Sequence, residues 1–273
     1  MKLVPFLAFF VMSSAHAEIV IDVNISPLPQ EFKSLEPAIR SHVVAAAKMW
    51  VSHFDVQACD KQTCNIQIEF SIKDWPARGT GHSLVSVPLD DQNYGGKFIT
   101  EEGAAHHLRT GINATPGSAS IEIFFDPIYF RTLWFDPDPV RRTAPMPDRS
   151  LEKLDAMSVI LHELGHAFGF NGFRNQKTGE LPGDFLSAYD RWVTFDGENF
   201  YFIGPNARKF YGKPIVLAKT NNNYHHVGDK GDNRDPGLQE DLMNGIVFDW
   251  SHRYSISALD IAMLSDCGLR LKK

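Results

Sequence analysis

The chain has few cysteines, one long hydrophobic run and no excess of basic residues. Three cysteines among 273 residues are too few for a disulfide-rich scaffold, and they lack the second pair that a cysteine-type zinc site needs. Lys and Arg total 27 against 33 acidic residues, which argues against nucleic acid as a main partner. With 43% hydrophobic residues and no repeat or low-complexity tract, the chain can form one sizeable domain or two small ones.

The hydrophobic run lies at the N-terminus, from Leu3 to Met12. It follows Lys2 and precedes an A-x-A sequence that ends at Ala17, which is the pattern of a secretory signal peptide. A membrane-spanning helix needs about 20 apolar residues, roughly twice this run. We predict a signal peptide over residues 1–17, cleavage after Ala17, and a secreted or periplasmic protein without a membrane span. An uncleaved N-terminal anchor is the alternative.

The cysteines agree with export. Cys59 and Cys64 bracket a short polar segment and can form a disulfide in an oxidising compartment. Cys267 lies in an apolar pattern near the C-terminus and is predicted to be a buried thiol.

Hydrophobic periodicity predicts an α+β chain. Alternation predicts strands in EIVIDVNI, CNIQIEFSI, HSLVSVPL, SASIEIFFDP and NFYFIG. Helical periodicity predicts helices over residues 37–54, 150–168 and 257–267, with a short helix in PNARKFYG. Asp148 or Ser150 can cap the second of these and Gly169 can end it, while Ser257 and Asp260 form a capping box. We predict an N-terminal subdomain, residues 18–170, with a mixed sheet, helices and the motif helix, and a less regular C-terminal subdomain, residues 171–273, ending in a helix.

The motif helix contains H-E-x-x-H. His162 and His166 are four residues apart, so they share a helical face and can both bind one ion. Glu163 is turned by about 100° and can reach a water on that ion without being a ligand. Zinc brings the pKa of a bound water near 7, and a glutamate can then accept the proton. The motif therefore predicts a zinc hydrolase with Glu163 as general base.

A catalytic zinc normally has three protein ligands and one open position. The position six residues after His166 holds Gly172, so the third ligand lies elsewhere. The residues leave several candidates open. These are Glu180 and Asp184, where Pro182 and Gly183 oppose a helix; Asp190; and the pair His225 and His226.

HELGHAFGF resembles the start of the metzincin zinc signature, in which the glycine, here Gly169, turns the chain towards the third ligand. Most metzincins carry that ligand three residues later, where this chain has Gly172. The leishmanolysin-like branch is similar to this chain, because a long insertion separates its glycine from its third His. HVGD and EDLMNG resemble the third-ligand region of that branch, and ISALDIAMLSDCGL resembles the segment that closes its catalytic domain. The likeness covers about residues 151–173 and 224–269.

The resemblance implies a metzincin-like zincin fold and a zinc endopeptidase. It favours His226 over His225 as third ligand, because an apolar residue follows it, and it makes Met243 the Met-turn residue and Gly169 the hinge. The chain departs from the family in having no room for a long pro-region. It also has Gly245 where some metzincins have a tyrosine.

The predicted activity is hydrolysis of a protein or peptide substrate bound in extended form, with SASIEIFFDP as the candidate sheet edge. One alternative is a zinc peptidase with an Asp or Glu third ligand. Another is a non-catalytic secreted binding or adhesion module with a structural zinc, which would have no need of Glu163. A Ca²⁺ site is a weaker option, because the spacing of the acidic loop fits no EF-hand. Its acids are Asp229, Asp232, Asp235, Glu240 and Asp241.

Overall fold

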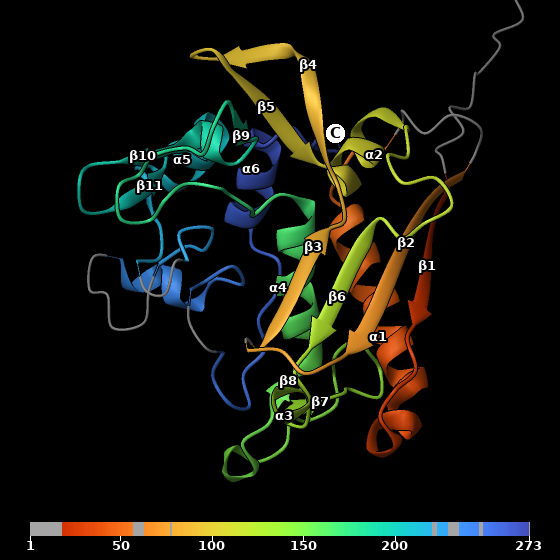
Figure 1. The fold of residues 1–273 in the computed structure, drawn as a ribbon. Helices are drawn as coiled ribbons and strands as arrows, with labels where there is room; N and C mark the ends of the chain where they lie inside the picture. The colour runs from red at the N-terminus through yellow and green to blue at the C-terminus, as the bar shows by residue number, and fades with distance from the viewer. Residues whose placement is uncertain are drawn as a thin grey trace, which may run out of the picture.

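The computed structural model describes residues 18–56, 63–76, 78–219, 223–228, 235–245 and 248–272. Its main feature is a four-stranded sheet with two helices on one face (Figure 1). The strands, in sheet order, are β1 (Glu18–Ile25), β2 (Thr63–Ile72), β6 (Ile121–Phe125) and β3 (Gly79–Ser83). The helices are α1 (Glu36–Val51) and α4 (Ala156–Phe168). The α+β class is therefore confirmed.

The core lies between this sheet and the two helices. β1, β2 and β6 run parallel, and alternate residues of β2, among them Ile66, Ile68 and Phe70, are buried. Trp50 of α1 is fully buried, and its indole N–H donates to the carbonyl of Leu161 in α4 at 2.8 Å. This contact fixes the motif helix against the rest of the layer.

Smaller elements surround the layer (Figure 1). The other strands are β4 (Ser86–Tyr94), β5 (Lys97–Glu102), β7 (Leu133–Trp134), β8 (Leu154–Asp155), β9 (Phe185–Ser187), β10 (Val193–Phe195), β11 (Phe200–Phe202) and β12 (Ile215–Val216). They form sheets β4-β5-β9, β10-β11-β12 and β7-β8. The other helices are α2 (Gly103–Thr110), α3 (Pro127–Phe130), α5 (Pro205–Tyr211) and α6 (Ala258–Asp266), with short 3-10 turns at Gln30–Leu35, Arg149–Leu151, Asp190–Trp192 and Pro236–Glu240.

The predicted sheet edge was wrong. β6, the core of SASIEIFFDP, lies inside the sheet between β2 and β3, and the edge strands are β1 and β3. β3 runs antiparallel to β6, and the chain then leaves the sheet, so that HSLVSVPL is split between β3 and β4. Pro88 does not end β4, because an outer strand tolerates a residue without an N–H.

The predicted start of the motif helix was also wrong. Asp148 caps only a 3-10 turn, and Glu152 adopts a positive φ of 49°, which ends that turn. Leu154 and Asp155 then pair with β7 as strand β8. Asp155 caps α4 by accepting a hydrogen bond from the Ser158 N–H at 2.9 Å. Two other helix ends were predicted correctly: Gly169 follows the C-terminal end of α4 with φ of 150°, and the Ser257–Asp260 capping box starts α6.

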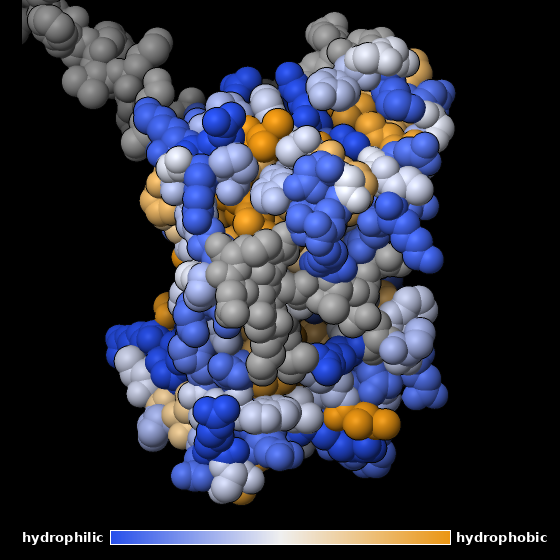
Figure 2. Space-filling view, turned by 90° about the vertical axis from the view of Figure 1, so that its left-hand side faces the viewer, coloured by the Kyte–Doolittle hydropathy of each residue, from blue (hydrophilic) through white to orange (hydrophobic). Residues whose placement is uncertain are grey.

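Several predictions concern residues outside the described ranges. The signal peptide, residues 1–17, and Cys59 lie there. Cys64 is disulfide-bonded, and Cys267 is a free, buried thiol, as predicted. In the part of the chain that the structure describes, no helix is long and apolar enough to cross a bilayer. Figure 2 shows one face of the molecule, on which hydrophilic residues predominate and hydrophobic residues are scattered.

Candidate metal centre

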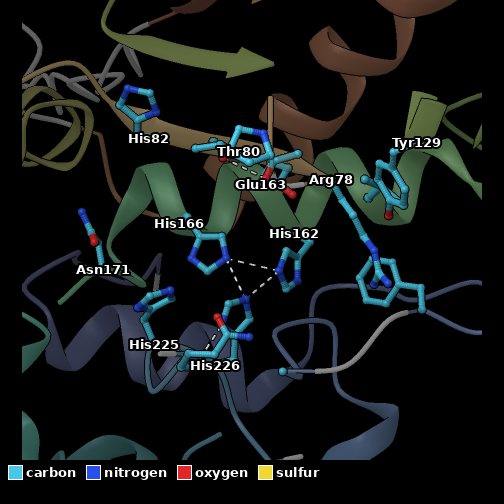
Figure 3. A pocket seen from close by; sticks show the side chains of 17 residues that line it. Arg78, Thr80, His82, Tyr129, His162, Glu163, His166, Asn171, His225 and His226 are labelled. Carbon is cyan, nitrogen blue, oxygen red and sulfur yellow. Dashed lines mark hydrogen bonds between the residues drawn. The ribbon is translucent and has the colours of Figure 1, made fainter. Parts of the chain in front are cut away.

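Three histidines converge beside α4 (Figure 3). His162 and His166 lie one turn apart on the helix, and His226 approaches from a segment 60 residues further along the chain. The Nε2 atom of His226 lies 3.0 Å from Nε2 of His162 and 3.0 Å from Nε2 of His166, and the two helical Nε2 atoms are 3.2 Å apart. Among the residues that the structure describes, these three histidines are the one group of His, Cys, Asp or Glu side chains placed to bind a metal ion.

Each imidazole is oriented by a backbone carbonyl. Nδ1 of His162 lies 2.7 Å from the carbonyl oxygen of Leu242, and Nδ1 of His166 lies 2.7 Å from that of Phe170. Nδ1 of His226 lies 3.1 Å from the carbonyl oxygen of Asn223. A carbonyl can only accept, so each Nδ1 carries the proton and each Nε2 presents a lone pair.

Three lone pairs at this separation repel one another unless a cation lies between them. Nitrogen ligands of a tetrahedral zinc lie about 2.0–2.1 Å from the ion and therefore about 3.3 Å apart. The Nε2 triangle of His162, His166 and His226 is close to that size. The donor set thus fits a metal such as zinc, with neutral imidazoles as ligands.

Burial keeps these imidazoles neutral. It lowers the pKa of His162 to about 3 and that of His166 to about 4, and the pKa of His226 falls well below its usual value. Repulsion from neighbouring imidazoles adds to the effect at His162 and His226. Because only neutral imidazole binds a metal, protons compete weakly with an ion here.

Met243 is fully buried and packs against Gly165, which lies between His162 and His166 on α4. A Cβ atom at Gly165 would lie 2.5 Å from the Met243 sulfur, so only glycine between the two helical ligands allows this approach. The Val227 N–H donates to the Met243 carbonyl at 2.8 Å, which ties the methionine to the residue after His226. The structure therefore places the predicted Met-turn residue directly against the metal-ligand segment.

The Glu163 side chain leaves α4 in a different direction from the two histidines, and its carboxyl group lies against β3. It accepts a hydrogen bond from the backbone N–H of Gly81, and burial raises its pKa to about 8. A Cβ atom at Gly81 would lie 2.1 Å from the Glu163 carbonyl oxygen, so glycine is needed for this close approach of strand and helix. A bound cation would act against the effect of burial and favour the carboxylate.

His225 is adjacent to the centre but not part of the triangle. Its ring centroid lies 5.4 Å from that of His166, and its side chain lines the same cleft. The group of histidines close enough to share one metal ion contains His226 and not His225.

The carboxylate candidates for the third ligand lie elsewhere. Glu180 and Asp184 are exposed. Asp190 is fully buried, and its Oδ1 accepts from the Tyr224 hydroxyl at 2.8 Å while its Oδ2 accepts from the Phe173 N–H at 2.8 Å. Asp190 therefore holds the turn after α4 against the segment that carries His226.

The same contacts explain Gly172. A Cβ atom there would lie 2.2 Å from the Tyr224 hydroxyl and 2.8 Å from Asp190 Oδ1. A side chain at position 172 would therefore collide with the Tyr224–Asp190 pair.

The cleft over the centre has a volume of about 740 Å³. One wall is the edge strand β3, and the floor contains the three histidines and Glu163. The sequence analysis missed Arg78, Tyr129 and Asn171, which also line the cleft. They come from three separate segments of the chain and form no motif in the sequence, so only the fold brings them together.

The described acids of the predicted calcium loop have other partners. Asp235 lies 2.8 Å from Lys213, Glu240 lies 3.4 Å from His252, and Asp241 accepts from the Met243 N–H at 3.0 Å. Asp229 and Asp232 lie outside the described residues.

Glu102 is buried beside the cleft and should make stability depend on pH. It accepts a hydrogen bond from Asn171 at 2.9 Å, but burial raises its pKa to about 7. The folded state therefore binds more protons than the unfolded state between pH 4.5 and 7, and stability falls as pH rises through this range. We expect Glu102→Gln to stabilise the protein at pH 8 by up to about 3 kcal/mol and to have little effect at pH 5.

Urea unfolding at both pH values measures this effect. Glu198→Gln is the matched control, because the Glu198 side chain is 75% exposed and should leave the pH dependence unchanged. If Glu102→Gln and the wild type lose stability equally between pH 5 and 8, Glu102 does not titrate as described.

Comparison with known proteins gives no match: no family model matches the chain, and no curated protein matches it.

Proposed function

We propose that the chain is a zinc-dependent endopeptidase with a metzincin-like zincin domain, resembling the leishmanolysin-like branch. The observation that carries this proposal is the convergence of His162, His166 and His226 with the Glu163 carboxyl beside them in an open cleft. His162, Glu163 and His166 of HELGHAFGF line this cleft together with His226 of HVGD (Figure 3), and Met243 of EDLMNG packs against Gly165 of the same helix.

Bound zinc would supply Lewis-acid chemistry: it polarises the scissile carbonyl and brings the pKa of its water near 7. His162, His166 and His226 would hold it through Nε2, with Nδ1 fixed by the backbone. Glu163 accepts the proton of the attacking water and passes it to the leaving amine. The Gly81 N–H orients the Glu163 carboxyl for both transfers.

The substrate would bind in extended form along β3. This strand is the sheet edge nearest the centre, and Gly79, Thr80, Gly81 and His82 line the cleft. A peptide can add to such an edge by main-chain hydrogen bonds, which would bring one of its carbonyls close to His162, His166 and His226. We propose export as well, on the signal-like sequence of residues 1–17.

The alternatives explain less. A structural zinc site would not need a glutamate beside its ligands, and a carboxylate third ligand would require Asp190, which is bound to Tyr224 and Phe173. The geometry therefore supports an enzyme with three histidine ligands best.

Metal removal tests the function. Residues 18–273, loaded with zinc, are expected to cleave casein; removal of the ion with a chelator should reduce cleavage to background, and added zinc should restore it. Circular dichroism of the apo protein shows whether it remains folded. A zinc-loaded, folded protein that cleaves no casein or peptide would contradict the proposal, as would cleavage that survives removal of the metal.

A further inference from the structure

Arg78 and Tyr129 lie together in the cleft, away from the metal group. Figure 3 shows both near the His162 end of α4, whereas His82 and Asn171 lie towards the His166 end. Arg78 directly precedes the edge strand β3, and Tyr129 belongs to α3. Both side chains line the cleft.

Asp126 forms hydrogen bonds with the backbone of both residues. The Asp126 N–H donates to the Arg78 carbonyl at 3.0 Å. The Asp126 carboxylate caps α3 by accepting from the N–H groups of Ile128 at 2.8 Å and Tyr129 at 3.2 Å. The relative position of the two residues is therefore fixed, as a preformed binding site requires.

The Arg78 guanidinium pairs with no carboxylate among the described residues. Other arginines are paired, such as Arg109 with Glu101, Arg142 with Asp155 and Arg253 with Asp136. Arg78 is exposed, and its charge is directed into the cleft. In a chain with 33 acids and 27 bases, this leaves a positive charge where a substrate would bind.

The Tyr129 phenol lies near two charged groups, Glu163 and Arg78. Burial and the nearby Glu163 raise its pKa, and the Arg78 guanidinium partly offsets this. The phenol therefore stays protonated near neutral pH and offers an O–H donor in the part of the cleft that Arg78 lines.

We propose that Arg78 and Tyr129 form a carboxylate-binding subsite, so that the enzyme prefers peptides with a carboxylate close to the cleaved bond. This inference rests on the proposed function. The guanidinium can bind a carboxylate through two N–H groups, and the Tyr129 hydroxyl can donate a third hydrogen bond. The carboxylate can belong to an Asp or Glu side chain or to the C-terminus of the peptide, because both present the same group.

Peptide binding tests the subsite without hydrolysis. In zinc-loaded Glu163→Gln protein, fluorescence anisotropy compares an amidated, otherwise neutral peptide carrying one Asp with the same peptide carrying Asn. We expect the Asp peptide to bind about tenfold more tightly, the usual effect of a hydrogen-bonded charge. Adding Arg78→Ala should remove the difference, and adding Arg78→Glu should reverse it in favour of a Lys peptide. Adding Arg208→Ala, an exposed arginine on α5 that does not line the cleft, should leave it unchanged.

A second comparison identifies the source of the carboxylate. If side chains are selected, the Asp peptide gains affinity with an amidated end; if the C-terminus is selected, the neutral peptide gains affinity when its end is free. Either gain must disappear with Arg78→Ala. Absence of peptide binding, equal affinity for all the peptides, or a preference that survives Arg78→Ala would overturn the subsite.

The two proposals fail separately. Hydrolysis by protein with native Glu163, together with equal binding of Asp and Asn peptides, leaves the peptidase proposal standing and overturns the subsite. An Arg78-dependent preference in binding, together with no hydrolysis, supports the subsite and overturns the peptidase proposal.

Discussion

Replacing Glu163 by glutamine is expected to lower kcat/KM for peptide hydrolysis by about 10²- to 10⁴-fold, while bound zinc stays at the wild-type level. Glutamine has nearly the same shape, and its side-chain oxygen can still accept the Gly81 N–H. It cannot accept a proton from water, so the general-base step is lost. The three histidine ligands are unchanged and should keep the metal. Metal analysis and steady-state kinetics on the same preparation measure both effects.

Glu198→Gln serves as the control for this substitution, because it makes the same chemical change on an exposed side chain. Two outcomes would contradict the role of Glu163. Activity within a few-fold of the wild type would mean that another group accepts the proton. Loss of zinc together with activity would mean that Glu163 supports the metal and not the chemistry.

Replacing His226 by alanine is expected to weaken zinc binding by more than about 100-fold, since even changes outside the ligand set cost 10- to 100-fold. His226 supplies one of three converging Nε2 atoms, and its removal leaves a two-ligand site. The protein should also lose the thermal stabilisation that zinc provides, because a ligand of the folded state stabilises it more the more tightly it binds. Zinc titration and melting curves with and without the metal measure these effects.

His225→Ala is the matched control, since it removes the same side chain one position earlier and outside the Nε2 triangle. It should retain zinc at one ion per chain. Asp190→Asn should retain zinc too, because Asp190 binds Tyr224 and Phe173 and not the centre. If His225→Ala loses the metal and His226→Ala keeps it, the assignment of the third ligand is wrong.

Local periodicity predicted much of the fold and half of the centre. The i, i+4 spacing placed His162 and His166 on one face, and the Ser257–Asp260 capping box was correct. The start of α4 was missed because Asp148 and Ser150 form a capped turn of their own. Their local hydrogen bonds satisfy the capping pattern without starting the helix, so the sequence alone cannot distinguish the two.

Long-range placement was less predictable. β3 has only five residues, and two of them are glycines, which are rare in strands, so its sequence gave little indication of a strand. Both glycines lie close to Glu163, where a larger residue would not fit. His226 was chosen over His225 from a family pattern, because periodicity does not apply to an irregular loop. Arg78 and Tyr129 were missed because they are 51 residues apart in the sequence. The hydrogen bonds of Asp126 bring their backbones together, and no sequence spacing predicts these bonds.

The carbonyls that orient the histidines also bear on how the chain can change its length. The partner of His166 is four residues away, at Phe170, and the partner of His226 is three residues away, at Asn223. His166 and His226 are thus oriented by carbonyls close to them in sequence, and the β10-β11-β12 sheet between them supplies neither. Since doubling a flexible loop costs only about 0.6 kcal/mol, the exposed turn between β10 and β11 can change length over evolution while both orienting carbonyls stay beside their histidines. Because the third histidine is distant in sequence, the surface between it and α4 can change while the arrangement of the three histidines is kept.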